Sequence, residues 1–145
     1  MHTLIQIADA VVTCLEGGAF SQSFTPVRRY RPVFKLEELA TLRVSVVPKE
    51  FEDEQETRDS SREELVVDVG VQKKLADHTD VAEIDALMAL VQEIIERLKA
   101  VPLEGVPAVR TKIANKPAFV PDHLDENHVF TSVVTVTYQM LVVGA

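Results

Sequence analysis

The chain has 145 residues and a formal net charge of −8 at pH 7, with 46% hydrophobic and 26% charged residues, which is typical of a single soluble globular domain over residues 1–145. The excess of carboxylates argues against general nucleic-acid binding, and the absence of Trp argues against a base-stacking platform. No apolar run approaches the roughly 20 residues that cross a bilayer, and the N-terminus lacks the features of a signal peptide, so we expect no membrane partner.

The first predicted element is a helix from Thr3, as its N-cap, to about Leu15, ended by Gly17-Gly18. Its apolar residues share one face: Leu4, Ile7, Ala8, Val11, Cys14 and Leu15. Cys14 is the only cysteine, which excludes an internal disulfide and fits a reducing compartment. Because no general base is near it in the sequence, we expect a buried apolar side chain rather than a nucleophile.

Residues 19–33 are predicted to form an extended, twisted strand that breaks near Thr25-Pro26 and ends at Pro32. Because proline cannot donate a hydrogen bond to a central ladder, this strand belongs at a sheet edge. It carries a basic cluster: Arg28, Arg29 and Arg31. These arginines either form a solvated face or bind an acidic partner such as a neighbouring subunit, and in the second case they are candidate subunit-interface residues.

Two segments alternate apolar and polar residues as a half-buried strand does. The first is residues 40–47, which Pro48 is expected to end, and the second is residues 65–73. Their expected core-facing residues are Leu42, Val44, Val46, Leu65, Val67, Val69 and Val71. The two segments are expected to form an antiparallel β-hairpin.

The connection between these strands, residues 49–64, is longer than most hairpin loops, and we expect no regular structure in it. It contains eight acidic residues and three basic ones, a net charge of −5 that accounts for most of the excess negative charge. Two interpretations remain open: a solvated, mobile loop that keeps the protein soluble, or a loop with a function.

The segment from Asp80 to Leu98 has the clearest helical pattern in the chain. Asp80 and Glu83 are spaced as a capping box, and Lys99 and Pro102 close the helix. The apolar spacing predicts that one face is buried against the strands, including Ile84, Leu87, Met88, Val91 and Ile95.

The last third of the chain is expected to supply one or two more strands. Residues 109–113 alternate as a short strand, residues 115–127 are expected to be irregular, and residues 129–143 are rich in β-branched residues, which predicts a central strand. The expected fold class is therefore α+β, with a mostly antiparallel sheet of four to five strands, two helices packed on one face and a long acidic hairpin loop.

The segment Asp122–His128 is the best candidate for chemistry, with two histidines and three carboxylates within seven residues. Its spacing matches no metal motif with a known mechanism, so it is either a solvated loop or a small metal- or ligand-binding module. His78, beside Asp77 and Asp80, is assigned to the cap of the following helix. The sequence offers no Gly-rich phosphate loop and no nucleophile elbow, so we predict no catalytic residue, no metal and no cofactor.

Several strand-like segments resemble a group of small phage and prophage proteins encoded in head-to-tail gene regions, and more widely the tail-terminator, or tail-completion, proteins of long-tailed phages. The similarity covers nearly the full chain and is carried by residues 20–24, 30–32, 36–39, 44–48, 67–74 and 130–138. The family's motifs are structural strand patterns, and neighbouring neck proteins of the virion are small α+β domains too. The alternative within the virion is therefore another neck or tail-tube subunit.

The resemblance implies a sheet flanked by helices and a structural protein without enzyme activity, located in the virion tail or neck after assembly in the host cytoplasm. It implies a homohexameric ring that ends tail-tube polymerisation and contacts the tail tube protein and the head-tail connector, while DNA passes through without specific binding. Acidic side chains of the 49–64 connection would then line the channel or form a docking loop: Glu52, Asp53, Glu54 and Glu56.

Overall fold

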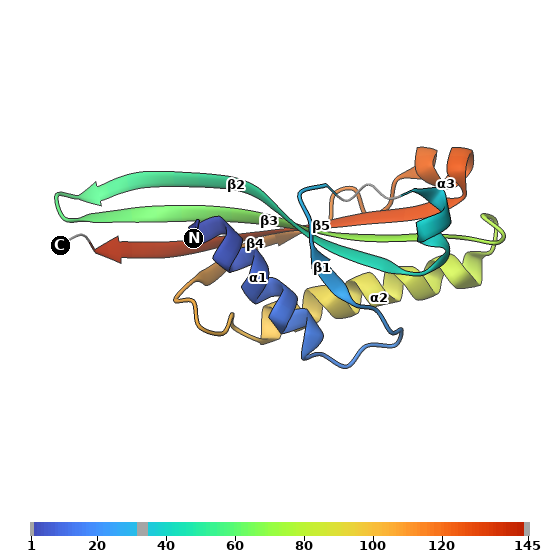
Figure 1. Ribbon diagram of the computed structural model, residues 1–145, viewed down its shortest axis with the longest axis horizontal. Coiled ribbons are helices and arrows are strands. Elements are labelled where there is room, and N and C mark those ends of the chain that lie inside the picture. The colour runs from blue at the N-terminus through green and yellow to red at the C-terminus, as the bar shows by residue number, and fades with distance from the viewer. Residues whose placement is uncertain (1, 32–34, 144–145) are drawn as a thin grey trace.

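Five strands form one mixed sheet in the order β1-β2-β3-β5-β4 (Figure 1). The computed structural model describes residues 2–31 and 35–143. Its elements are α1 (Thr3–Glu16), β1 (Pro26–Arg28), the 3-10 helix η1 (Leu36–Ala40), β2 (Arg43–Thr57), β3 (Ser60–Lys74), α2 (Val81–Ala100), β4 (Val109–Ala114), α3 (Pro121–Asn127) and β5 (Val129–Val143). Among the described strands, β1 pairs in parallel with β2, and the other neighbouring strands are antiparallel. The predicted α+β class is confirmed.

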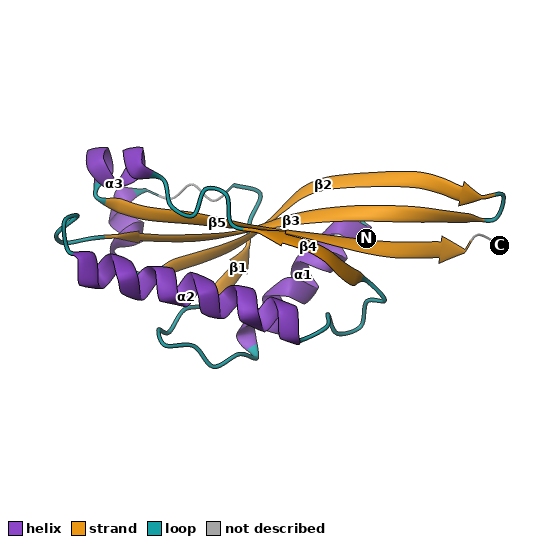
Figure 2. Ribbon diagram, turned by 180° about the vertical axis from the view of Figure 1, so that it is seen from behind, coloured by secondary structure: helices purple, strands orange, loops and turns teal. Residues whose placement is uncertain are grey.

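One hydrophobic core joins the sheet to the two long helices. Its centre is a stripe of fully buried residues on β3: Leu65, Val67, Val69 and Val71. The same cluster includes side chains from α1, α2, β2 and β5. Both ribbon views draw α1 and α2 along the same side of the strands (Figure 2). Among the described residues, no helix has both the length and the apolar character that a membrane crossing requires.

Helix α2 begins where the sequence predicts. The Asp80 side chain caps it by accepting a hydrogen bond from the backbone N–H of Glu83 at 3.3 Å. The buried face is rotated slightly from the predicted one: Leu87, Val91 and Ile94 have the spacing that the sequence predicts, but Leu90 is fully buried as well. Three residues that we expected to be buried are only half-buried at the margin of the core: Ile84, Met88 and Ile95.

Helix α1 matches its predicted range, and Cys14 is buried as expected. Its predicted cap is wrong, because Thr3 lies inside the helix and His2 is the N-cap. The imidazole Nδ1 of His2 accepts a hydrogen bond from the backbone N–H of Leu4 at 3.1 Å. A histidine ring nitrogen thus caps this helix in place of the side-chain oxygen of Ser, Thr or Asp that usually does so.

The most important correction concerns residues 49–64, which are not an irregular loop. Strand β2 continues through Pro48 to Thr57, and β3 begins at Ser60, so the turn between them holds only residues 58–59. Pro48 is accommodated because a bulge shifts the register between Pro48 and Glu50. β2 is also near the edge of the sheet here, since β1 pairs with it only over residues 44–46.

Two smaller predictions also fail. The strand expected over residues 19–33 is reduced to the three residues of β1, which does lie at the sheet edge, and its expected end at Pro32 lies outside the described residues. The stretch expected to be irregular contains α3, which begins with Pro121 at a favourable first position. The predicted strands over 109–113 and 129–143 are confirmed as β4 and β5, with β5 inside the sheet between β3 and β4.

Candidate assembly surface

The sheet extends well beyond the helices as a three-stranded arm, which we define as residues 50–57 of β2, 60–64 of β3 and 139–143 of β5 (Figures 1 and 2). The arm begins at the N-terminal end of α1, where this helix stops covering the sheet. There, the rings of His2 and Phe51 meet edge to face, with centroids 5.2 Å apart. Beyond this contact, the arm is a bare sheet with solvent on both faces.

The four candidate carboxylates lie on the arm, and the register divides them between its faces. Phe51 is opposite the buried Leu65, so it continues the core face. By alternation, Asp53 lies on the core face and Glu52 and Glu54 lie on the opposite face. Because the bulge at Pro48 reverses this alternation, the sequence alone would have assigned these side chains to the wrong faces.

The arm places like charges directly opposite each other. Glu52 is paired with Glu64, and Asp53 is paired with Glu63. Such cross-strand pairs destabilise a sheet. Glu56 differs from the other three candidates, because its Oε1 lies 3.0 Å from Nε of Arg62 in an ion pair. The arm therefore holds a concentrated negative charge that only Arg62 offsets by an ion pair among the described residues.

The end of β5 exposes apolar side chains on the arm. Leu141 is 64% and Val143 is 73% exposed. β4 stops opposite Gln139, so the last four residues of β5 have no strand beside them on that edge. An open, apolar strand edge is a surface that favours pairing with another chain.

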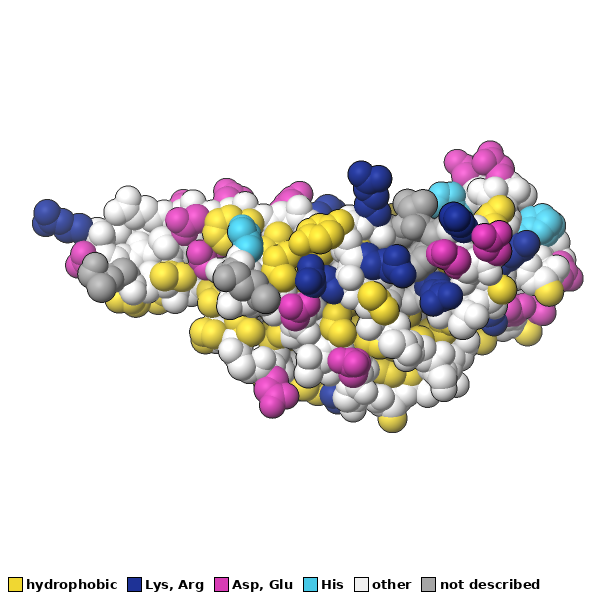
Figure 3. Space-filling view, viewed as in Figure 1, with side chains coloured by type: hydrophobic (Ala, Val, Ile, Leu, Met, Phe, Trp, Pro, Cys, Tyr) yellow, Lys and Arg dark blue, Asp and Glu magenta, His cyan; other side chains and the backbone are white. Residues whose placement is uncertain are grey.

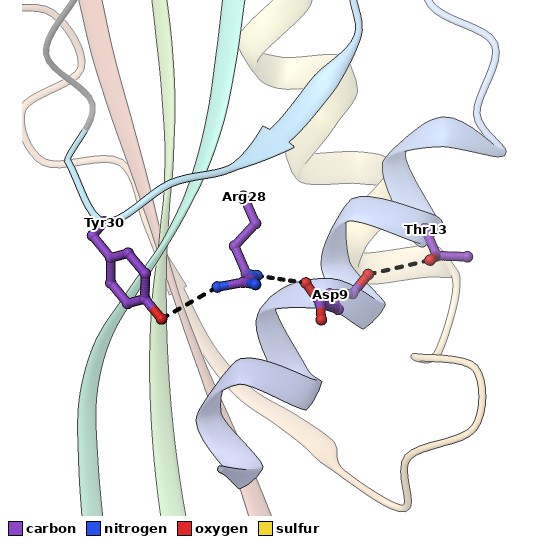
Figure 4. A network of polar contacts seen from close by, with 4 residues as sticks. All are labelled: Asp9, Thr13, Arg28 and Tyr30. Carbon is purple, nitrogen blue, oxygen red and sulfur yellow. Dashed lines mark hydrogen bonds and ion pairs between the residues drawn. The ribbon is translucent and has the colours of Figure 1, made fainter. Parts of the chain in front are cut away.

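The three arginines of the predicted interface do not behave alike. Nε of Arg28 lies 2.7 Å from Oδ1 of Asp9 on α1, and its guanidinium stands 5.7 Å from the centre of the Tyr30 ring (Figure 4). Hydrogen bonds to Tyr30 and to Asp9 raise the pKa of Arg28 above its usual value. Arg28 thus joins β1 to α1 within its own subunit.

Arg29 and Arg31 are exposed side chains next to β1. The backbone N–H of Arg29 donates to the carbonyl of Val46 at 2.9 Å, which continues the parallel pairing of β1 by one residue. On the face that Figure 3 shows, Lys and Arg side chains gather over the middle of the molecule. Asp and Glu side chains lie along the arm, which has a basic side chain at its tip, and at the opposite end of the molecule. This separation of charge along one flank is a feature that a partner of complementary charge could recognise.

The histidines of the Asp122–His128 segment point to different partners. His123 Nδ1 lies 3.0 Å from the hydroxyl of Thr131. His128, in the left-handed conformation that ends α3, stacks on His78 with ring centroids 4.2 Å apart. Asp77 accepts hydrogen bonds from the side chain and backbone of Thr79, which lower its pKa. Within the described ranges, no group of three or more His, Cys, Asp or Glu side chains is arranged to hold a metal ion.

Sequence reasoning missed one charged feature, on strand β4. Arg110 and Lys112 are the charged residues of this strand, and both are basic. β4 forms the edge of the sheet opposite to β1, so these side chains border the other flank of the molecule. The signal was present in the sequence, because one edge strand carries bases alone and the arm of β2 is mainly acidic. It could be used only once the strand order was known.

Compared with known proteins, the chain matches no protein-family model and no curated protein.

Proposed function

We propose that this protein is a structural virion subunit that assembles with copies of itself into a homohexameric ring at the head-proximal end of a phage tail tube. The ring ends tube polymerisation and presents a surface to the head-tail connector. DNA passes through its opening without specific binding. The observation that carries this proposal is the bare three-stranded arm, which leaves two strand edges unpaired.

The physical argument starts from those edges. An unpaired strand presents a row of N–H and C=O groups that another chain can bind, and monomeric proteins usually shorten or cover such edges. Here β2 is unpaired on its outer side along the arm, and β5 ends in exposed apolar residues. A ring of identical subunits removes both open edges, because each subunit covers the edge of the next.

The negative charge of the chain supports a channel through which DNA passes rather than a nucleic-acid-binding site. The formal net charge is −8 at pH 7, and a tight DNA contact would require basic side chains facing the phosphates. A ring that DNA must traverse needs the opposite property, an opening that does not hold the duplex. The strand patterns that resemble tail-terminator proteins support the same position in the virion.

Electron microscopy of the purified protein over a range of concentrations tests the proposal, with native mass spectrometry to count subunits. We expect rings with a central hole and a mass of six chains. Addition of the rings to growing tail tubes should stop tube elongation, whereas a heat-unfolded sample should leave elongation unchanged. A protein that forms no ring, alone or on tube ends, would contradict the proposal.

A further inference from the structure

Two free strand edges on opposite flanks of the sheet, the part of β2 that β1 does not cover and β4, carry opposite charges. The free edge of β2 bears Glu52, Asp53 and Glu54, and the opposite edge, β4, bears Arg110 and Lys112. None of these five side chains forms an ion pair with any other residue in the described part of the chain. Each edge therefore has charge available for a partner of the other sign.

Within one subunit, these edges are too far apart to neutralise each other. Two strands, β3 and β5, separate β2 from β4. Three strand spacings amount to about 14 Å, which exceeds the screening length of roughly 8–10 Å at physiological salt. The acidic edge is also repelled by its own sheet, because Glu52 is opposite Glu64 and Asp53 is opposite Glu63. A cationic strand beside β2 would relieve that repulsion.

We propose that β4 of one subunit pairs with the free edge of β2 of a second copy of this chain, as an antiparallel ladder. This inference rests on the proposed function and identifies the joint between neighbours in the ring. Along β2, β3, β5 and β4, each strand is antiparallel to the next, so β4 runs opposite to β2. Rotation about an axis parallel to the strands preserves their direction. The neighbour's β2 is then antiparallel to β4, and the same pairing continues across the joint.

The charges match on each face of the sheet as well as on each edge. Lys112 is opposite Thr137, on the face that carries Glu52 and Glu54. Arg110 is opposite the buried Tyr138, on the core face, where Asp53 lies. In the joint, Lys112 meets the neighbour's glutamates on one face, and Arg110 meets the neighbour's aspartate on the other. Hydrogen bonds between an ionised donor and an ionised acceptor are stronger than those between neutral groups.

The same joint brings together a second pair of oppositely charged features, the acidic helix α3 and an arginine that follows β1. Backbone bonds from Val120 N to Thr131 O and from Val133 N to Pro117 O place residues 117–120 beside β5, on the flank of β4. Helix α3 follows directly and exposes Asp122, Asp125 and Glu126. On the other flank, exposed Arg31 follows β1. In the proposed joint, Arg31 of one subunit therefore faces the acidic helix α3 of the next.

The same charges disfavour a two-fold dimer through either edge. A β2–β2 joint would bring carboxylates against carboxylates, and a β4–β4 joint would bring bases against bases. Only the head-to-tail joint brings opposite charges together. Such a heterologous joint closes into a ring when the rotation between neighbours closes.

Two charge-reversed variants test the joint. The first carries Glu52→Lys and Glu54→Lys, so that both of its edges are basic, and the second carries Arg110→Glu and Lys112→Glu, so that both are acidic. By light scattering and native mass spectrometry, we expect each variant alone to be monomeric under conditions in which the wild type forms rings. An equimolar mixture should restore rings in which the two variants alternate. Lys112→Glu alone replaces the second variant if circular dichroism shows that the double change unfolds.

Matched controls carry charge changes of the same sign and size, four units each, away from both edges: Lys74→Glu with Lys99→Glu, and Asp85→Lys with Glu104→Lys. These controls should assemble as the wild type does. The inference is overturned if either reversed variant still forms rings alone, if the mixture stays monomeric, or if the controls lose assembly equally. If the wild type forms rings, any of these three outcomes rejects the β4–β2 joint but not the proposed function. A wild type that forms no ring overturns both.

Discussion

Asp9 of α1 and Arg28 of β1 form an ion pair with 2.7 Å between Oδ1 and Nε. This contact joins β1, which pairs in parallel with β2, to the first helix. It also divides the arginine cluster, because Arg28 has a partner inside its own subunit while Arg31 follows it as an exposed side chain. The two arginines should therefore respond differently to substitution.

Arg28→Ala is expected to lower the free energy of unfolding of the monomer by about 0.2–1 kcal/mol, the range for a partly exposed ion pair. The side chains of Arg28 and Asp9 are 30% and 47% exposed, so solvent screens the pair and a larger loss is not expected. Urea unfolding of Arg28→Ala, Asp9→Ala and the double variant gives the coupling energy directly. A coupling energy of zero would show that the contact does not stabilise the fold.

Arg31→Glu and Arg29→Glu are expected to leave the monomer folded and to weaken the ring, since an exposed arginine beside β1 is suited to pair with carboxylates of the next subunit. Sedimentation velocity of the wild type and of each variant at equal concentration measures the effect. Lys99→Glu, near the end of α2, serves as the control for a change of two charge units. Unchanged assembly in Arg31→Glu would mean that this arginine is only a solvated side chain.

Leu87→Ala is expected to lower the free energy of unfolding by about 2–5 kcal/mol, because the change leaves a cavity under α2. Leu87 is fully buried, whereas Leu36 is 47% exposed. Leu36→Ala therefore makes the same chemical change outside the core and should cost less than about 0.5 kcal/mol. Equal losses for the two variants in denaturant unfolding would show that the α2 face is assigned wrongly.

The helices and most strands could be predicted because their signals are local. The spacing of Leu87, Val91 and Leu98 fixes the core face of α2, and the Asp80 cap fixes its start. The alternation around Val67 and Val69 likewise fixes the inner half of β3. These patterns depend on residues near each other in the chain, so no knowledge of the sheet order is needed.

The arm could not be predicted, since its stability depends on strand pairing far along the chain. Pro48 and the carboxylates that follow it indicate a loop when each is considered locally. Residues 60–64 of β3 pair with β2 on one side and with the end of β5 on the other, and this pairing on both sides keeps the acidic segment in a sheet. The charge match between Lys112 and Glu52 is hidden for the same reason, because it needs the strand order.

Tyr138→Phe is expected to keep or raise the free energy of unfolding, by about 1 kcal/mol at most. The side chain is 2% exposed, and its hydroxyl has no hydrogen-bond partner among the described residues. A buried hydroxyl without a partner costs free energy that phenylalanine avoids. Tyr30→Phe, at a site 70% exposed, is the matched control and should not be stabilised. A marked loss of stability in Tyr138→Phe would mean that the hydroxyl does have a partner in solution.

The same burial predicts a loss of stability in alkaline solution. Burial raises the pKa of Tyr138 and also that of Cys14, so both groups hold their protons more tightly in the folded state. The unfolded chain releases these protons first, near the ordinary values of 10.0 and 9.0. Stability is therefore complete below about pH 9 and falls as the pH rises above it. Tyr138→Phe should reduce this fall in urea unfolding at pH 8 and pH 10.5, and an equal fall in both proteins would contradict the assignment.

The last prediction concerns the candidate carboxylates of the arm: Glu52, Asp53, Glu54 and Glu56. In a ring whose long helices α1 and α2 lie outside, the opposite face of the sheet, with Glu52 and Glu54, turns towards the opening. The neighbour's Lys112 offsets one of these two charges in the proposed joint, and the remaining negative charge, repeated in each subunit, would repel phosphates over roughly 8–10 Å. Replacing the four residues by Gln and Ser removes this charge and the like-charge pairs with Glu63 and Glu64. That relief offsets the loss of the exposed Glu56–Arg62 ion pair, so the fold should not suffer.

Because neutral side chains keep the backbone ladder between subunits, we expect these variant subunits to build normal-looking particles that deliver DNA poorly. Electron microscopy counts the particles, and infectivity per particle measures delivery in a phage whose own subunit is replaced by the variant. A control variant neutralises four exposed carboxylates away from the arm: Glu16, Glu37, Asp85 and Glu104. Tails that fail to join heads would assign the arm to docking instead. Fully infectious particles would contradict both roles and leave a solvated arm, since neither repulsion in the channel nor a charged contact would then be needed.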